Sequence, residues 1–127
     1  MFQLKAVGIV KNDFKEPVKP AKIREKNSQI IIHEEFSEGL YKIEENDCLQ
    51  VVFYLNKSNG FKLKGKRRGK ELGVFACRSP HRPNSIAVTT VKLIRRDKNR
   101  LIVEGLDAID KTPIIDIKPY VSQIDEC

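Results

Sequence analysis

Short apolar runs separated by turn-forming residues recur along the whole chain. No segment of ten or more residues repeats its apolar positions with the 3.6-residue period of an amphipathic helix. The most apolar stretch, VVFYL, lies within a predicted strand at Leu49–Leu55, and a strand apolar on both faces is typical of the centre of a sheet. The other predicted strands are Leu4–Val10, Gln29–His33, Phe61–Lys64, Val74–Ala76, Ile86–Arg95, Leu101–Glu104 and Ile114–Ile117.

Turn signals separate these strands. Asn59-Gly60 precedes the Phe61 strand, and Asp97-Lys98-Asn99 predicts a hairpin turn between two later strands. Residues 11–27 hold two prolines and many charges, so we expect them to form an ordered arm or a mobile loop. Glu38–Ile43 is the one segment that indicates a helical turn.

The number of short strands predicts the fold class. Seven or eight strands in 127 residues are typical of an all-β domain, either a small barrel or a sandwich. We favour a closed or nearly closed β-barrel with little helix, because closure removes exposed sheet edges that so few helices would leave uncovered. The length allows one modest core, so we expect a single domain over residues 1–127.

Composition narrows the class of protein further. With 40% hydrophobic and 32% charged residues, the chain is typical of a globular protein. VVFYL is too short to cross a bilayer, and the N-terminus shows no signal peptide, so we expect a cytoplasmic protein with no membrane partner. Three cysteines without C-x-x-C spacing and two histidines without a ligand motif predict neither disulfides nor a metal site.

Charge is distributed unevenly along the chain. The net charge is +7, and seven lysines and arginines but no acid lie between Lys57 and Lys70, whereas residues 34–47 are acidic. A basic segment of this kind suits an RNA backbone, and we place Lys66, Arg67 and Arg68 among the expected RNA contacts. A solvated, lysine-rich hairpin end is an equally good interpretation of the charge alone.

The stretch GVFACRSPHRPNSIAVTT, residues 73–90, has strand-like ends, and its centre holds two arginines, a histidine, two prolines and an asparagine. Two prolines stiffen this centre, so that Arg78 and Arg82 are held in position to clamp a carboxylate or phosphate, and Asn84 can both donate and accept. In the alternative interpretation both arginines pair with nearby acids such as Asp107 and Asp110 and only hold the loop.

The stretch GLDAIDKTPIIDIKPY, residues 105–120, interrupts an apolar alternation with aspartates. Asp110-Lys111-Thr112-Pro113 is typical of a tight turn in which the aspartate accepts a backbone N–H. Such a turn would present backbone groups outward to a planar ligand such as adenine, although a hairpin turn without any ligand fits the same residues.

Together the two stretches resemble the TsaA-like, or TrmO, family, through GVFACRSPHRPNSI (73–86) and GLDAIDKTPIIDIKPYV (105–121). VGIV (7–10) and EEFSEGLYKIEE (34–45) are weaker matches. The resemblance implies a small β-barrel that uses S-adenosylmethionine to methylate the exocyclic amine of threonylcarbamoyl-adenosine at position 37 of tRNA. It also implies a homodimer with the methyl donor in a cleft close to the subunit interface.

The family's donor-binding positions carry over to four segments of this chain. They are Pro20, Ala21 and Lys22; Leu55 and Asn56; Arg78 and Val88; and Asp110, Lys111, Thr112 and Pro113. Lys66, Arg67, Arg68, Arg82 and Asn84 are then the expected tRNA-binding residues. No catalytic base is assigned. Asp107 and His81 are the two candidates, and for His81 a hydrogen-bonding role within the loop is favoured.

The chain departs from the family pattern at several positions. Ser85-Ile86-Ala87 replaces a usual Pro-Ile-Gly, and Lys111 stands where a glycine is usual, which makes a positive φ costlier. Longer members carry a C-terminal domain, whereas this sequence stops soon after KPYV. Two alternatives follow, namely a donor-binding barrel without transferase activity, acting as a sensor or carrier, and an RNA-binding module without a small molecule.

Overall fold

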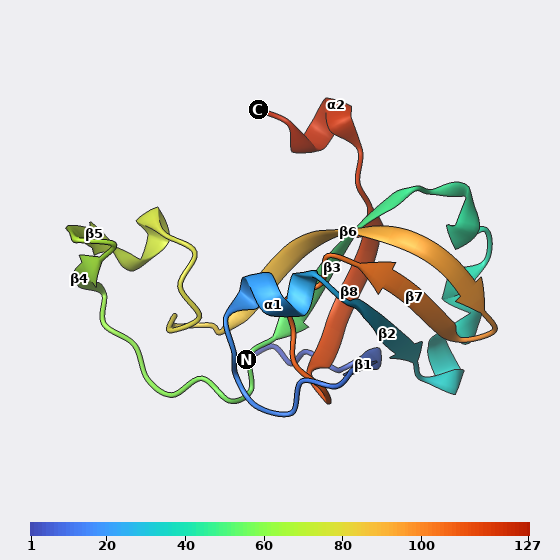
Figure 1. Cartoon of the computed structure of the whole chain (residues 1–127), viewed down its shortest axis with the longest axis horizontal. Coiled ribbons are helices and arrows are strands. Elements are labelled where there is room, and N and C mark those ends of the chain that lie inside the picture. The colour runs from blue at the N-terminus through green and yellow to red at the C-terminus, as the bar shows by residue number, and fades with distance from the viewer.

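The strands close into a small antiparallel barrel. The computed structural model describes residues 1–127 and shows six strands in the order β1-β2-β7-β6-β3-β8, with β4 and β5 as a separate hairpin (Figure 1). The predicted all-β barrel is therefore confirmed. The barrel strands are β1 (Gly8–Lys11), β2 (Asn27–Ile32), β3 (Cys48–Tyr54), β6 (Ile86–Asp97), β7 (Arg100–Glu104) and β8 (Pro113–Pro119).

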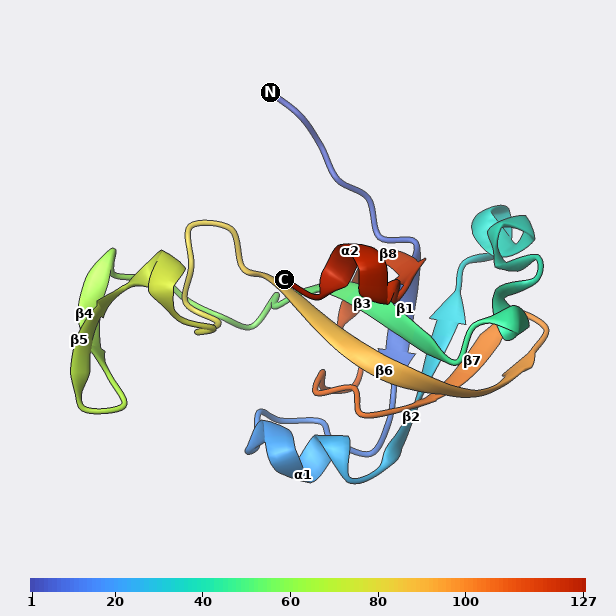
Figure 2. The same ribbon diagram turned by 90° about the horizontal axis from the view of Figure 1, so that it is seen from above.

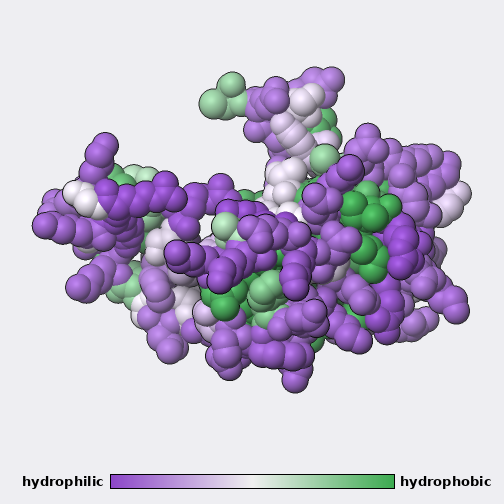
Figure 3. All heavy atoms as spheres, viewed as in Figure 1, coloured by the Kyte–Doolittle hydropathy of each residue, from purple (hydrophilic) through white to green (hydrophobic).

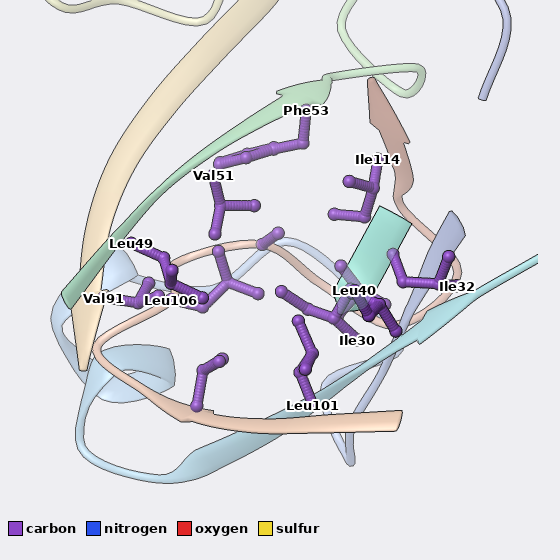
Figure 4. Close-up of a cluster of buried hydrophobic side chains, with 13 residues drawn as sticks. Ile30, Ile32, Leu40, Leu49, Val51, Phe53, Val91, Leu101, Leu106 and Ile114 are labelled. Carbon is purple, nitrogen blue, oxygen red and sulfur yellow. The ribbon is translucent and has the colours of Figure 1, made fainter. Parts of the chain in front are cut away.

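Alternation of side chains along the strands builds the core. In β3, Leu49, Val51 and Phe53 are at most 1% exposed, because every second side chain of a strand points into the barrel. Matching residues of the other strands meet them in a cluster of 13 buried side chains (Figure 4). β3 pairs with both β6 and β8, which confirms its predicted central position.

Helical pieces are short. They are α1 (Pro20–Arg24), α2 (Ser122–Asp125) and the 3₁₀ turns η1 (Glu34–Leu40), η2 (Ile43–Glu45) and η3 (Val74–Ala76). The helical turn predicted at Glu38–Ile43 spans the end of η1 and the start of η2, which Tyr41 and Lys42 separate. The 11–27 segment is an ordered arm that holds α1 against the barrel through the buried Ile23 (Figure 2). None of these helices has the length and apolar character needed to span a membrane.

β4 (Lys64–Arg67) and β5 (Lys70–Gly73) form a hairpin that projects away from the barrel (Figures 1 and 2). We call residues 57–76 the arm. Its turn lies at Arg68-Gly69, with φ of 54° and 76°, as a two-residue type I′ turn requires. The turn predicted at Asn59-Gly60 lies instead at Asn56-Lys57, although Gly60 does have a positive φ of 66°.

Three predicted strands differ from the structure where no partner strand is available. The strand predicted at Phe61–Lys64 is displaced into β4, and Val74–Ala76 is the 3₁₀ turn η3 at the base of the arm. The strand predicted from Leu4 begins only at Gly8, because its partner β2 ends at the paired residue Ile32. Apolar residues alone do not make a strand, since each strand also needs a neighbour for its hydrogen bonds.

Candidate functional site

One rim of the barrel gathers the strand ends that carry the predicted donor-binding residues. Because neighbouring strands are antiparallel, the end of β3 lies beside the start of β6, where Tyr54 pairs with Ile86. The start of β8 lies beside the end of β1, where Ile9 pairs with Pro113. β3 also pairs with β8, so segments far apart in sequence surround one opening.

The short helix α1 lies at this same rim. It leads into β2, whose first residue Asn27 pairs with Glu104 at the end of β7. Arg24, the last residue of α1, donates a hydrogen bond of 3.1 Å from Nη1 to Oδ2 of Asp107. The first turn of α1 holds Pro20, which suits a first helical position because it has no N–H to satisfy there. Its neighbours Ala21 and Lys22 are exposed.

The proline-containing loop, residues 77–85, is tied to the segment that follows β3. The backbone N–H of Leu55 donates to the carbonyl of Ser85 at 2.8 Å. The Ser58 hydroxyl lies 3.1 Å from the carbonyl of Pro80 and 3.0 Å from Nδ1 of His81. The loop therefore lies against Leu55 and Asn56, two of the predicted donor-binding positions, and His81 has the hydrogen-bonding role that the sequence favoured.

The two arginines of the loop have different environments. Arg82 is half-buried, and its Nη1 donates to the carbonyls of Cys77 at 2.8 Å and Ser79 at 3.3 Å, which closes the loop on itself. Arg78 is exposed and uses Nη2 for a single 2.6 Å hydrogen bond to the carbonyl of Val88. Arg78 thus keeps donors for a ligand, and Arg82 mainly supports the loop. Asn84 is exposed beside them.

The alternative in which both arginines pair with Asp107 and Asp110 is wrong. Asp107 accepts hydrogen bonds from Arg24 and, at 2.6 Å, from the hydroxyl of Thr89. Asp110 pairs with Lys15, whose Nζ lies 2.8 Å from Oδ2. Each of these acids therefore pairs with a basic residue of the 11–27 segment.

The tight turn predicted at Asp110–Pro113 is present one residue earlier, at residues 109–112, because Pro113 already begins β8. The N–H and the hydroxyl of Thr112 both donate to the carbonyl of Ile109, at 3.3 Å and 2.7 Å. Lys111 has a φ of 69°, so a lysine occupies the left-handed region that glycine adopts at lower cost. Asp110 accepts the N–H of Asn12 at 3.0 Å, as expected for an aspartate in a turn.

The turn does not present its backbone N–H groups outward, which corrects the expectation from the sequence. The N–H of Asp110 donates to the carbonyl of Phe14 at 2.8 Å, and that of Lys111 donates to the carbonyl of Val10 at 2.7 Å. Both donors face the chain that follows β1. The groups that remain for a ligand at this turn are carbonyl oxygens and the Lys111 side chain.

Asp110 is the one charged residue of the chain that is buried. The residue is only 7% exposed. The hydrogen bond from the Lys15 ammonium, followed by that from the Asn12 N–H, lowers the pKa of Asp110 below its ordinary value. The sequence did not predict that Asn12 and Lys15 contact Asp110. Both lie in the segment 11–27, whose prolines and charges do not indicate how its backbone runs over the barrel.

Ser85-Ile86-Ala87, which replaces the usual Pro-Ile-Gly, does not cover the predicted donor-binding residue Val88. Ala87 pairs with Phe53 and packs against the core cluster, so its methyl group points into the barrel. Ile86 and Val88, its neighbours on β6, are 37% and 38% exposed on the outer face. The methyl of Ala87 therefore adds core contact without covering Val88, the predicted donor-binding residue.

The arm carries the predicted RNA-binding cations on its surface. Lys66 and Arg68 are exposed, and hydrophilic side chains cover most of the arm (Figure 3). Arg67 differs, since its guanidinium donates to the carbonyls of Leu72 at 2.8 Å and Lys62 at 3.3 Å. Arg67 therefore stiffens the hairpin, whereas Lys66 and Arg68 keep their charges free.

No group of three or more His, Cys, Asp or Glu side chains is arranged to hold a metal ion, and all three cysteines are free. Cys48 begins β3, as expected of a strand residue. Cys77 lies after η3 rather than in a strand.

The chain is similar to proteins described by their methyl donor or by their tRNA substrate. The family model of the tRNA-methyltransferase O N-terminal domain matches residues 8–126. An S-adenosyl-L-methionine-binding protein of Archaeoglobus fulgidus is 39% identical over 96% of this chain and 91% of its own. The tRNA (adenine(37)-N6)-methyltransferase of Homo sapiens is 35% identical over 68% of this chain and 21% of its own.

Solved structures have the same fold. A crystal structure of TrmO from Pseudomonas aeruginosa superposes with a TM-score of 0.82 at 28% identity, covering 100% of this chain and 59% of the other.

A second A. fulgidus protein, named "Probable S-adenosyl-L-methionine-binding protein", is 40% identical over 98% of this chain. The chain spans only 36% of that longer relative.

Proposed function

The chain belongs to the TrmO family, and we propose that it is an S-adenosylmethionine-dependent tRNA methyltransferase. The substrate we propose is the exocyclic amine of threonylcarbamoyl-adenosine at position 37. Human and rodent relatives are named for methylation at that adenosine, and archaeal relatives are named for binding the methyl donor.

The observation that carries this proposal is the convergence of four separate segments on one rim of the barrel. α1, the end of β3, the start of β6 and the 109–112 turn come together there through antiparallel pairing. The positions to which the family resemblance assigns donor binding fall in these four segments.

The residues at this rim fit the chemistry of S-adenosylmethionine. The exposed guanidinium of Arg78 has free donors for the carboxylate of the methionine portion. Ile86 and Val88 offer exposed apolar surface to the adenine ring. The carbonyls of Asp110 and Lys111 accept no backbone hydrogen bond and suit its amino group.

The donor, when bound, supplies an activated methyl group on a positively charged sulfur. The protein then has to position the two reactants in line and to exclude competing geometries. Arg82, Ser58 and the prolines fix the loop that carries Arg78, so its position is set before a ligand binds. This division of roles assigns positioning to the loop and binding to the exposed guanidinium.

Asp107 is better described as a positioning residue than as a base. Both of its carboxylate oxygens already accept hydrogen bonds, from Thr89 on β6 and from Arg24 on α1. These bonds join α1 to the barrel wall at the rim. We propose that Asp107 holds α1, and with it Pro20, Ala21 and Lys22, in place for donor binding.

We also propose that the protein functions as a homodimer in the cytoplasm. The arm projects from the barrel with large apolar side chains exposed, and Leu63 is 65% and Phe75 80% exposed (Figure 2). Tyr54 on the rim is 45% exposed as well. An extended hairpin with apolar residues gains most by packing against a second copy of the barrel.

Arg78→Ala tests the donor site. We expect purified wild-type protein to bind S-adenosylmethionine in a calorimetric titration and the variant to lose that binding with its fold intact. Arg95→Ala is the matched control, because Arg95 is also an exposed arginine but lies near the end of β6, away from the loop that carries Arg78. Unchanged affinity in Arg78→Ala would remove Arg78 from the site.

A donor-binding protein without transferase activity is the second candidate. The A. fulgidus relative of matching length is named only for binding S-adenosylmethionine. This candidate predicts that tRNA nucleosides from cells lacking the gene have the same mass profile as those from wild-type cells. Loss of a methylated threonylcarbamoyl-adenosine in the mutant cells would exclude it.

A further inference from the structure

A polar groove of about 520 Å³ lies beside the 109–112 turn, outside the predicted donor-binding positions except for the turn itself. Its walls come from the outer faces of β1 and β2 and from the 12–15 loop. Val10 points into the core, so its neighbours Ile9 and Lys11 face outward. Lys11 pairs with Gln29 across the two strands, and both side chains line the groove.

The groove has free positive charge and hydrogen-bond donors. Lys11, Lys15 and Lys111 line it, and of these only Lys15 forms an ion pair, with Asp110. Gln29 accepts a hydrogen bond of 2.9 Å from Arg100 through Oε1, which leaves its amide NH₂ to donate. Asp13 is the one remaining acid in the lining. An extended anion suits such a surface better than an apolar ligand.

Lys111 adds a positive charge to the turn at the edge of the groove. Its φ of 69° is a conformation in which glycine is less strained, and glycine is usual at this position in the resembling family. Lys42, Arg68 and Lys98 also have a positive φ. What distinguishes Lys111 is its place in the lining of the groove, beside Lys11 and Lys15.

The groove continues the basic surface of the arm. Lys57, where the arm begins, places its Nζ 3.5 Å from the carbonyl of Lys15 in the 12–15 loop. The acidic segment of residues 34–47, with η1 and η2, lies at the opposite end of the barrel from the arm (Figure 1). A polyanion is therefore attracted along the arm to the rim and the groove, and repelled from the far end.

We propose that this groove holds the phosphodiester backbone of tRNA next to the adenosine being methylated, with Lys11 and Lys111 binding phosphates and Gln29 donating to the backbone. This rests on the proposed function of the rim. It adds a second RNA surface, next to the base of the arm and to the 109–112 turn.

Lys11→Gln tests the proposal directly. Binding of tRNA purified from cells is measured at several salt concentrations, and one lost phosphate contact should reduce the slope of log K against log salt by about 0.7 to 0.9. Donor affinity by calorimetry should not change, since Lys11 lies outside the donor positions. An unchanged salt slope would overturn the proposal.

Lys111→Gly and Lys98→Gly form a matched pair. Lys98 is also an exposed lysine with a positive φ, 56°, but it lies in the β6–β7 turn at the other rim. Glycine should raise the melting temperature by about 2–4 °C in both. Only Lys111→Gly should also weaken tRNA binding, so equal tRNA affinity in the two variants would contradict the assignment.

Failure of this inference and failure of the proposed function give different results. If wild-type protein methylates tRNA while Lys11→Gln and Lys111→Gly bind it as wild type does, the groove is wrong and the function stands. If wild-type protein neither binds nor methylates tRNA, both are wrong.

Discussion

Asp110 illustrates how one side chain organises the rim. Its carboxylate accepts hydrogen bonds from Asn12 and Lys15, and its own N–H donates to the carbonyl of Phe14. One residue of the turn therefore fixes the start of the 11–27 segment. The sequence predicted an aspartate that accepts a backbone N–H in a turn. It could not predict which N–H, because the partner lies 98 residues away.

Asp110→Asn should lower the free energy of unfolding at neutral pH by about 1.5–3 kcal/mol, the scale of a hydrogen bond to a charged group. The pKa of Asp110 is lowered in the folded protein, so its contribution is present above the unfolded pKa of about 3.9 and is lost as pH falls through the folded pKa. Urea unfolding across pH checks this. The gap between wild type and variant should shrink in acid, and a constant gap would contradict the assignment.

The two loop arginines mark the limit of residue-scale prediction. The stiff loop predicted positioned guanidiniums, and Arg78 is exposed as a ligand-binding residue must be. Arg82 instead donates to carbonyls of its own loop. Residue type and spacing were equal for both, and only the folded backbone decides which guanidinium has a carbonyl within reach.

At the scale of elements, α1 is too short to be stable alone. A five-residue helix is held by tertiary contacts, here the buried Ile23 and the Arg24–Asp107 pair. The sequence did not predict α1. The segment around it holds two prolines and many charged residues, and its apolar residues do not repeat with a helical period.

Asp107→Asn should loosen α1 without unfolding the barrel. We expect faster amide hydrogen exchange in residues 20–26 and unchanged exchange in β3. A double-mutant cycle with Arg24→Gln should give a coupling of about 0.2–1 kcal/mol, as for other exposed ion pairs. If both single variants show wild-type exchange in α1, the pair does not hold the helix.

The barrel strands were predicted from alternation because each has a buried face and two neighbours. Gln29–His33, Leu49–Leu55, Ile86–Arg95, Leu101–Glu104 and Ile114–Ile117 all overlap observed strands. The arm was predicted poorly, because its residues have no core to give a period. Its apolar side chains Leu63 and Phe75 are exposed in the single chain, so the usual link between hydrophobicity and burial fails there.

At the scale of the whole molecule, the exposed apolar arm predicts association. Sedimentation velocity should show a dimer for the wild type and a monomer for Phe75→Glu, because a charge cannot enter an apolar interface unpaired. Tyr41→Glu is the control, since Tyr41 is a 76% exposed aromatic residue on the acidic end, away from the arm. A dimeric Phe75→Glu protein would exclude Phe75 from the interface.

Positive and negative charges are concentrated at opposite ends of the molecule. Basic residues cover the arm, while residues 34–47 hold the acids at the other end of the barrel. The groove adjoins the rim with the predicted donor positions at the 109–112 turn, and the base of the arm at Lys15. The sequence predicted both charged segments, but their placement at opposite ends depends on how the barrel closes.

The central claim is that this rim transfers a methyl group to tRNA. The most direct measurement combines purified protein, S-adenosylmethionine with a labelled methyl group, and tRNA that carries unmethylated threonylcarbamoyl-adenosine at position 37. Nucleoside mass analysis should show the labelled methyl on that nucleoside with wild-type protein and none with Arg78→Ala. Wild-type protein that binds the donor and leaves the nucleoside unmethylated would contradict the account.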